Sequence, residues 1–136
     1  MADKMDDHDH LIQAARAARE RAYAPYSNFK MGAAIQTETG ETVPGFLIEN
    51  ISLGLSMCAE RVALYSAVTQ SAGKPTVLVL HAPKTDGDVT WPCGACLQVA
   101  REIAGPDLTV ITTNGKETRT AKLNDLAPSL PGKTAS

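Results

Sequence analysis

The sequence lacks the features that mark membrane, secreted and nucleic-acid-binding proteins. No apolar run approaches the roughly 18 to 20 residues that span a bilayer, and the polar amino end MADKMDDHDH does not resemble a secretory signal. The formal net charge is only −2 and the 13 Lys and Arg residues are scattered, so the basic footprint of a duplex DNA or RNA binder is missing. We therefore expect a cytoplasmic protein that uses no membrane and no nucleic acid, with room left for a small base or nucleoside.

Cysteine is scarce as well, with three residues in the whole chain: Cys58, Cys93 and Cys96. An odd number cannot all pair within one chain, which argues against a disulfide framework. The length suits one domain that buries its own core. We expect a single domain over residues 1–136, with flexible tails at 1–8 and 129–136, and three thiols available for metal binding or catalysis.

Helices and strands alternate along most of the chain. An Ala- and Arg-rich segment with a face of small residues predicts a helix from about Asp9 to Ala24, stopped by Pro25. Two apolar runs joined by a Thr-Gly turn predict a hairpin, in which Pro44 places the second strand at an edge or delays its start. Further along we expect a helix at 58–73, a strand at 75–83, a surface loop at 84–90, a helix at about 96–104, and strands at 107–112 and 117–123. This order predicts an α/β domain, with a mixed sheet, parallel crossovers and helices on its faces.

The stretch WPCGACLQVARE, residues 91–102, places two cysteines three apart at the start of a predicted helix. Such a CxxC pair is either a redox dithiol or half of a metal site, and the pair alone does not decide between them. This stretch differs from the thioredoxin motif, because Pro92 separates Trp91 from Cys93 and no proline stands between the cysteines.

Cys58 offers a third thiol in the same setting. It lies at the start of another predicted helix, where free N–H groups and the helix dipole stabilise a thiolate. Parallel crossovers bring successive helix starts to one edge of a sheet, so Cys58 can meet the CxxC pair and share a tetrahedral Zn²⁺ with it. No histidine is spaced to act as a fourth ligand. A three-ligand zinc leaves one position for water and lowers the pKa of that water, which is the mark of a catalytic site.

Two charged residues follow Cys58 in the word CAER. Glu60 stands on the same helical turn, where a general acid and base could take the proton of the water and pass it to a substrate nitrogen. Arg61 could donate to the sulfurs and offset the negative charge of three thiolates on a dication. Each residue also has an ordinary interpretation: Cys58 as a core thiol, Glu60 as a solvated first-turn carboxylate and Arg61 as a surface ion-pair residue. Together with the CxxC pair, the set favours catalytic zinc.

The words CAER and PCGAC resemble the zinc-dependent cytidine deaminases, in the small homotetrameric type with three cysteines at the zinc. Three further motifs, AYAPYSNFKMGAA, IEN and QVARE, stand where the family has similar motifs and in the same order. The resemblance covers about residues 11–126. It implies a three-layer fold with a mixed sheet of about five strands, bound Zn²⁺ and a homotetramer. The activity it implies is hydrolytic deamination of cytidine, deoxycytidine or a related aminopyrimidine nucleoside, with release of ammonia.

The resemblance also implies roles for single residues. The three cysteines would bind zinc and Glu60 would shuttle the proton. Ala59 would offer its backbone amide to the pyrimidine O2, Phe29 would lie against the base or sugar, and Glu49 would accept a hydrogen bond from a sugar hydroxyl. Phe29 and Glu49 also have structural interpretations, the first as core packing and the second as a cap of the loop before the second helix.

The substrate-binding words depart from the family pattern. In FLIEN, Leu47 stands where the family usually has an asparagine that helps to bind the ribose 3′-hydroxyl, a bond that leucine cannot make. Leu53 stands where an aromatic is frequent, Leu97 stands where arginine is usual, and the family's carboxyl-terminal aromatic has no counterpart. We therefore expect an intact metal centre and an altered sugar pocket. Three alternatives stay open: a deaminase of a sugar-modified cytosine nucleoside, like blasticidin S deaminase; a catalytically weak zinc-binding member of the fold; and a thiol redox protein.

Overall fold

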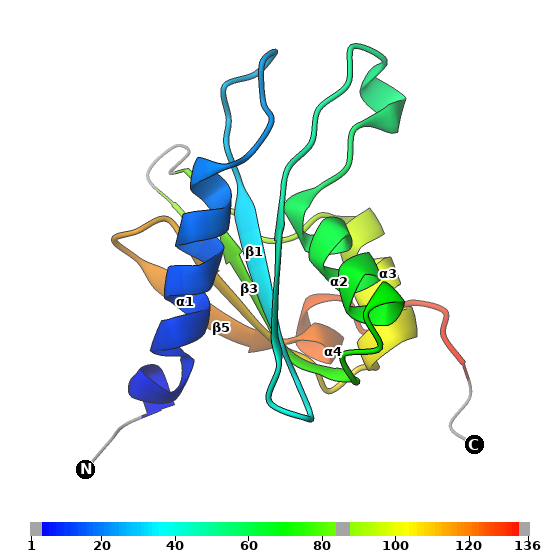
Figure 1. Ribbon diagram of the computed structural model, residues 1–136. Helices are drawn as coiled ribbons and strands as arrows, with labels where there is room; N and C mark the ends of the chain where they lie inside the picture. Colours follow the sequence, from blue (N-terminus) through cyan, green and yellow to red (C-terminus); the bar gives the residue numbers. More distant parts are fainter. Residues whose placement is uncertain (1–3, 84–87, 134–136) are drawn as a thin grey trace.

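The computed structural model describes residues 4–83 and 88–133 of the chain (Figure 1). Its elements are α1 (Lys4–Glu20), β1 (Gly32–Thr37), β2 (Thr42–Phe46), the 3-10 turn η1 (Leu53–Leu55), α2 (Ala59–Thr69), β3 (Pro75–His81), α3 (Gly94–Ala104), β4 (Thr109–Thr113), β5 (Thr118–Lys122) and α4 (Leu123–Leu126). The predicted α/β class is confirmed, and so is the sheet of about five strands.

The five strands form one mixed sheet in the order β2-β1-β3-β4-β5. Strand β1 runs antiparallel to both β2 and β3, β3 runs parallel to β4, and β4 runs antiparallel to β5. Strands β2, β3 and β4 therefore run in the same direction, so the crossover helices α2 and α3 begin at the same edge of the sheet. Pro44 lies opposite Ala34 in the edge strand β2, where a residue without an N–H is tolerated, as the sequence predicts.

Helices cover both faces of the sheet, which makes the predicted three layers (Figure 1). Side chains alternate between the two faces along each strand. Ile35 and Leu78 pack in a buried cluster with residues of α2 and α3. Ala34 and Val79 point the other way and pack in a second cluster with α1, where Leu11 is fully buried.

Two glycines let the helices lie directly on the sheet. A Cβ atom on Gly32 of β1 would lie 2.2 Å from the backbone oxygen of Ala15 in α1. A Cβ atom on Gly45 of β2 would lie 2.5 Å from the backbone nitrogen of Ala63 in α2. The small-residue face predicted for the first helix thus packs against a strand that is equally free of bulk at the point of contact.

The ends of the chain differ most from the sequence-based expectation. Helix α1 begins at Lys4 rather than Asp9, so residues 4–8, which we expected in a flexible tail, belong to the helix. No glycine or proline occurs in the first 24 residues, so the sequence offers no signal for the start. Helix α4 was not predicted, because four residues are too few to show a helical period. The chain forms no further helix or strand from Ala127 to Lys133.

Part of the predicted surface loop, residues 84–87, lies outside the described residues, as do 1–3 and 134–136. Within the described ranges, no helix is both long and apolar enough to cross a membrane.

Two loops project from the sheet edge at which α2 and α3 begin (Figure 1). One joins α1 to β1, and the other joins β2 to α2. Main-chain bonds tie them together: the N–H of Tyr23 donates to the oxygen of Leu47, and the N–H of Glu49 donates to the oxygen of Tyr23, each at 2.8 Å. The second loop also folds back on itself through the paired residues Ile48 and Met57. The two loops therefore form one unit immediately before Cys58.

Candidate active site

The three cysteines converge at this edge of the sheet. Cys58 is the N-cap of α2, Cys93 is the N-cap of α3, and Cys96 lies in the first turn of α3. Their sulfur atoms all lie within 4.8 Å of one another, and those of Cys93 and Cys96 are 3.6 Å apart. The fold therefore brings Cys58 next to the CxxC pair, as the sequence predicts.

The spacing of the sulfurs fits a metal ion. Zinc–sulfur bonds of about 2.3 Å in a tetrahedron hold two sulfurs roughly 3.8 Å apart, close to the distance between Cys93 and Cys96. In the part of the chain that the structure describes, the cluster contains no fourth histidine, cysteine or carboxylate. The three cysteines can therefore hold zinc and leave one coordination position for a small molecule.

The surroundings of Cys58 favour ionisation of its thiol. Nη2 of Arg61 donates to the sulfur of Cys58 at 3.3 Å. A hydrogen bond from Cys96, together with this guanidinium, lowers the pKa of Cys58 to about 5. The same bond raises the pKa of Cys96, which is also buried, so Cys58 is the first of the pair to lose its proton. The contact expected between Arg61 and the sulfurs is thus present.

Glu60 is buried beside the sulfurs, with 1% of its surface exposed. Its Oε1 atom has no hydrogen-bond partner among the described residues. Burial raises the pKa of its carboxyl group to about 7, and the negative charge on Cys58 adds to the rise. The ordinary interpretation of Glu60 as a solvated residue is therefore wrong, because a solvated carboxyl would not be buried and unpaired. Such groups are concentrated at functional sites.

Ala59 occupies the first position of α2 and is fully buried. The first bond within this helix runs from the N–H of Val62 to the oxygen of Cys58. Amide groups before Val62 have no acceptor inside the helix. The backbone of Ala59 is thus placed to donate to a ligand beside the cysteines.

Glu49 caps the loop between α1 and β1. Its Oε1 atom accepts the N–H groups of Tyr26 and Ser27 at 3.0 and 3.2 Å, and its Oε2 atom accepts the Ser27 hydroxyl. The hydroxyl bond of Ser27, followed by the two amide bonds, lowers the pKa of Glu49. Glu49 therefore has a structural role, but the loop it caps is the one between α1 and β1 and not the expected loop before α2. These bonds leave the proposed contact with a sugar open.

Phe29 lies two residues after Ser27, half-buried. It belongs to none of the buried apolar clusters formed by residues 4–83 and 88–133. This position does not support the interpretation of Phe29 as a core residue, and it keeps the ring available to a ligand.

Leu47 does not behave as a pocket residue. Its side chain is 9% exposed and packs in a small apolar cluster with Ala22 and Ala24. Its backbone N–H donates to the oxygen of Met31. The two other leucines that depart from the family pattern differ in their surroundings. Leu97 is buried in the main core, whereas Leu53 is 79% exposed at the tip of the second loop.

Sequence reasoning missed Ser27 and Thr112. The hydroxyl of Thr112, buried in β4, donates to the oxygen of Thr90 and so anchors the segment that leads to Cys93. Both contacts join residues 22 positions apart, so no local pattern reports them. The turn motif PYSN was the one local feature of the sequence that could have drawn attention to Ser27.

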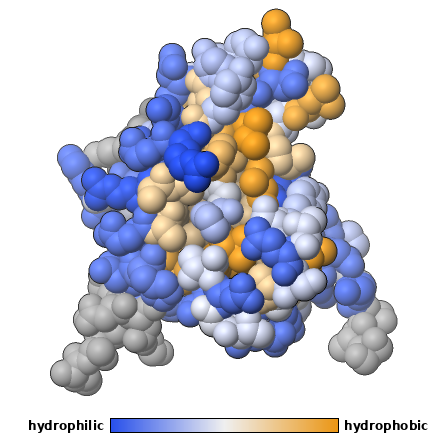
Figure 2. Space-filling view, viewed as in Figure 1, coloured by the Kyte–Doolittle hydropathy of each residue, from blue (hydrophilic) through white to orange (hydrophobic). Residues whose placement is uncertain are grey.

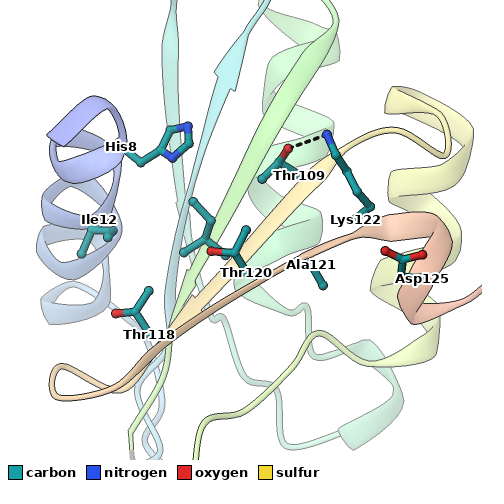
Figure 3. Close-up of a pocket in the computed structure, with 9 residues that line it drawn as sticks. His8, Ile12, Thr109, Thr118, Thr120, Ala121, Lys122 and Asp125 are labelled. Carbon is teal, nitrogen blue, oxygen red and sulfur yellow. Dashed lines mark hydrogen bonds between the residues drawn. The ribbon is translucent and has the colours of Figure 1, made fainter. Parts of the chain in front are cut away.

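A separate cavity of about 600 Å³ lies on the opposite face of the sheet (Figure 3). His8 and Ile12 of α1 form one wall, and Thr118 and Thr120 of β5 form another. Lys122 at its rim donates to Thr109 at 3.1 Å. The sheet separates this cavity from α2 and α3, so it does not belong to the cysteine site.

Comparison with known proteins places this geometry in a family. Residues 5–112 match the family model for the cytidine and deoxycytidylate deaminase zinc-binding region. The cytidine deaminase of Sporosarcina psychrophila is 41% identical over 121 residues, covering 86% of this chain and 88% of that protein. The crystal structure of cytidine deaminase from Burkholderia pseudomallei matches with a TM-score of 0.83 at 42% identity, covering 90% of this chain and 98% of that one.

A blasticidin-S deaminase from Bacillus cereus is a more distant relative, 30% identical over 125 residues, covering 86% of this chain and 89% of that protein. All these relatives are matched over most of their length, and the family model covers both the CAER and the PCGAC words. The chain therefore belongs to the zinc-binding cytidine and deoxycytidylate deaminase family.

Proposed function

We propose that the protein hydrolyses the 4-amino group of cytidine or deoxycytidine, or of a closely related aminopyrimidine nucleoside. Water adds its oxygen to C4, the bond from C4 to the amino nitrogen breaks, and the products are the uracil nucleoside and ammonia. The observation that carries the proposal is the buried, unpaired carboxyl of Glu60 beside three convergent cysteine sulfurs.

The chemistry divides between a metal and this carboxyl. Cys58, Cys93 and Cys96 would hold zinc, which would act as a Lewis acid and lower the pKa of a water molecule. Glu60 would take one proton from that water and give it to the ring nitrogen, and would then take the second proton, from the hydroxyl now on C4, and give it to the departing amine. One group can do both only if it gains and loses a proton near neutrality, and the pKa of about 7 suits Glu60 to this exchange.

Three residues would hold the nucleoside. Ala59 offers the first amide of α2 to the O2 atom of the base, Phe29 lies against the ring, and Glu49 accepts a sugar hydroxyl. The supporting observations are the helix start at Ala59, the half-buried Phe29 and the ionised carboxylate of Glu49. These are the positions at which the chain matches the family's words.

A second candidate is deamination of a sugar-modified cytosine nucleoside. Leu47 favours it, because an apolar side chain packed with Ala22 and Ala24 gives no hydrogen bond to a ribose hydroxyl. The 30% identity to a blasticidin-S deaminase is compatible with it but is lower than the identity to several cytidine deaminases.

We also propose that the protein is a homotetramer. The tip of the second loop exposes large apolar side chains, with Ile51, Leu53 and Leu55 each at least 70% exposed. A groove of about 460 Å³ runs between α1 and α2 over strand β2, and Figure 2 shows apolar surface along this strip and at the loop tip. Exposed apolar surface of this extent is typical of contacts between subunits. Light scattering tests the assembly, and a monomer would contradict it.

A cytoplasmic location is the remaining proposal. Three unpaired thiols support it, because a reducing compartment preserves them.

A panel of substrates tests the proposed activity. Ammonia release would be measured from cytidine, deoxycytidine, sugar-modified cytosine nucleosides and free cytosine with the zinc-loaded protein. We expect cytidine and deoxycytidine to be the best substrates. A strong preference for sugar-modified nucleosides would favour the second candidate, and no turnover of any amine with zinc bound would identify a catalytically weak member of the family.

A further inference from the structure

The carboxylate of Glu49 is held by a residue that has no assigned role. Ser27 stands on the loop before β1, and Glu49 stands on the loop before α2. Ser27 contributes two donors, its N–H to Oε1 at 3.2 Å and its hydroxyl to Oε2. The N–H of Tyr26 adds a third at 3.0 Å. Both oxygens of the carboxylate are therefore held by residues of the loop between α1 and β1.

The same hydroxyl reaches Phe29. The N–H of Phe29 donates to Oγ of Ser27 at 3.0 Å, while this oxygen donates its own proton to Glu49. A serine hydroxyl has one proton to give and lone pairs to receive with, so both bonds can form together. Asn28, between the two residues, adopts a left-handed turn with φ of 58°. One hydroxyl thus links the carboxylate to the backbone of the aromatic residue.

The bonds leave Glu49 with limited free capacity. An ionised carboxylate offers about four acceptor sites, and three are occupied by Tyr26 and Ser27. Room is left for about one hydroxyl donor from a ligand. Leu47 cannot supply a second polar contact, because its side chain is packed among alanines.

We propose that Ser27 is a positioning residue of the nucleoside pocket, whose hydroxyl orients Glu49 toward one sugar hydroxyl and fixes the backbone of Phe29 beside the base. The inference rests on the proposed function, in which Glu49 contacts a sugar hydroxyl and Phe29 contacts the base. In this arrangement Ser27 governs how tightly the nucleoside binds and leaves the chemistry at Glu60 unchanged. The ionisation of the Glu49 carboxyl supports this role of Ser27, because the Ser27 hydroxyl is the main cause of the lowered pKa of Glu49.

The test compares Ser27→Ala with Ser27→Thr, which keeps the hydroxyl. A hydrogen bond to a charged group typically changes affinity by on the order of tenfold, so we expect Ser27→Ala to raise the KM for cytidine about tenfold while kcat changes less than about threefold. Ser27→Thr should restore most of the loss. With 2′,3′-dideoxycytidine, which offers Glu49 no ring hydroxyl, the effect of Ser27→Ala on KM should shrink severalfold.

Ser56→Ala is the matched control. The Ser56 hydroxyl also accepts a loop amide, the N–H of Asn50 at 3.0 Å, whereas the hydrogen bonds to Glu49 among the described residues come from Tyr26 and Ser27. We expect its KM to stay within about twofold of wild type, since only a loop bond of ordinary strength is lost.

Titration of the Glu49 carboxyl by NMR supplies a readout that needs no turnover. We expect Ser27→Ala to raise the pKa of Glu49 toward its ordinary value and Ser56→Ala to leave it unchanged. An unchanged KM and an unchanged Glu49 pKa in Ser27→Ala would overturn the inference, and so would a raised pKa with an unchanged KM. If the wild-type protein deaminated no nucleoside, the proposed function would fail and this inference with it, whereas an active wild type with an insensitive Ser27→Ala would overturn the role of Ser27 alone.

Discussion

The sulfur atoms of Cys58 and Cys93 lie within 4.8 Å of each other, although the whole of strand β3 separates the two residues in the sequence. Each cysteine is the N-cap of a crossover helix. Strands that run in one direction bring such helix starts to the same edge of the sheet. The metal centre is therefore a product of the sheet's topology, and its assembly requires the complete fold.

Replacing Cys96 by serine should empty this centre. Wild-type protein should hold about one zinc per chain after dialysis, whereas Cys96→Ser should hold less than about 0.1, because losing a ligand exceeds the roughly 10- to 100-fold effect of losing an outer partner. Metal analysis of both proteins measures this. Ala95→Ser, on the exposed part of the same turn, is the matched control and should keep its zinc.

Two results would speak against this account of the cysteines. Full zinc occupancy in Cys96→Ser would remove that residue from the centre. A metal-free wild-type protein with a reversible disulfide between Cys93 and Cys96 would instead support the thiol redox alternative.

Changing Leu47 to asparagine should destabilise the protein without restoring a sugar contact. The new amide would enter the apolar cluster with Ala22 and Ala24, at a cost of about 2 to 4 kcal/mol in the free energy of unfolding. Urea unfolding measures the loss, and Leu47→Met, which conserves volume, should cost much less. A stable Leu47→Asn variant with a lower KM for cytidine would show that position 47 faces the ligand after all.

His81 should make stability depend on pH. It is 4% exposed at the end of β3, and burial, together with the charges of Arg19 and Arg16, lowers its pKa. Because an unfolded histidine has a pKa of about 6.5, the unfolded chain takes up this proton before the folded chain does as the pH falls. The contribution of neutral His81 to the free energy of unfolding is therefore fully present above about pH 6.5 and is lost as the pH falls below that value.

Urea unfolding at pH 8 and pH 5.5 tests this dependence. The wild-type protein should lose more of its free energy of unfolding between these values than His81→Gln does. His10→Gln, which removes an exposed imidazole from α1, is the control. Equal losses in wild type and His81→Gln would contradict the role given to His81.

The metal centre could be predicted because its signals are local and repeated. Cys58 and Cys93 each precede a helix, and the alternation of strands and helices brings the two helix starts together. The burial of Glu60 could not be read from its position in a first helical turn, which is solvated in most helices. It results from tertiary packing, since α2 lies against the sheet and against α3.

The residues of the proposed sugar-binding region, in contrast, could not be placed from the sequence. The sequence marks Leu47 as unusual, but only tertiary packing shows that its side chain belongs to a cluster with Ala22 and Ala24. The bond between Ser27 and Glu49 joins two loops whose approach depends on main-chain contacts such as that of Tyr23 with Leu47. Such contacts leave no periodic pattern, so they emerge only with the fold.

The most direct test of the account is ammonia release from cytidine by Glu60→Gln with its zinc content verified. Glutamine preserves the size of the side chain and removes its ability to carry a proton at neutral pH. We predict one ammonia per uridine formed in the wild-type protein, and in Glu60→Gln about one zinc per chain with kcat lowered by a factor of about 10² to 10⁴, the range for loss of a general acid and base. A Glu60→Gln variant that released ammonia at close to the wild-type rate would contradict the proposed role of this carboxyl.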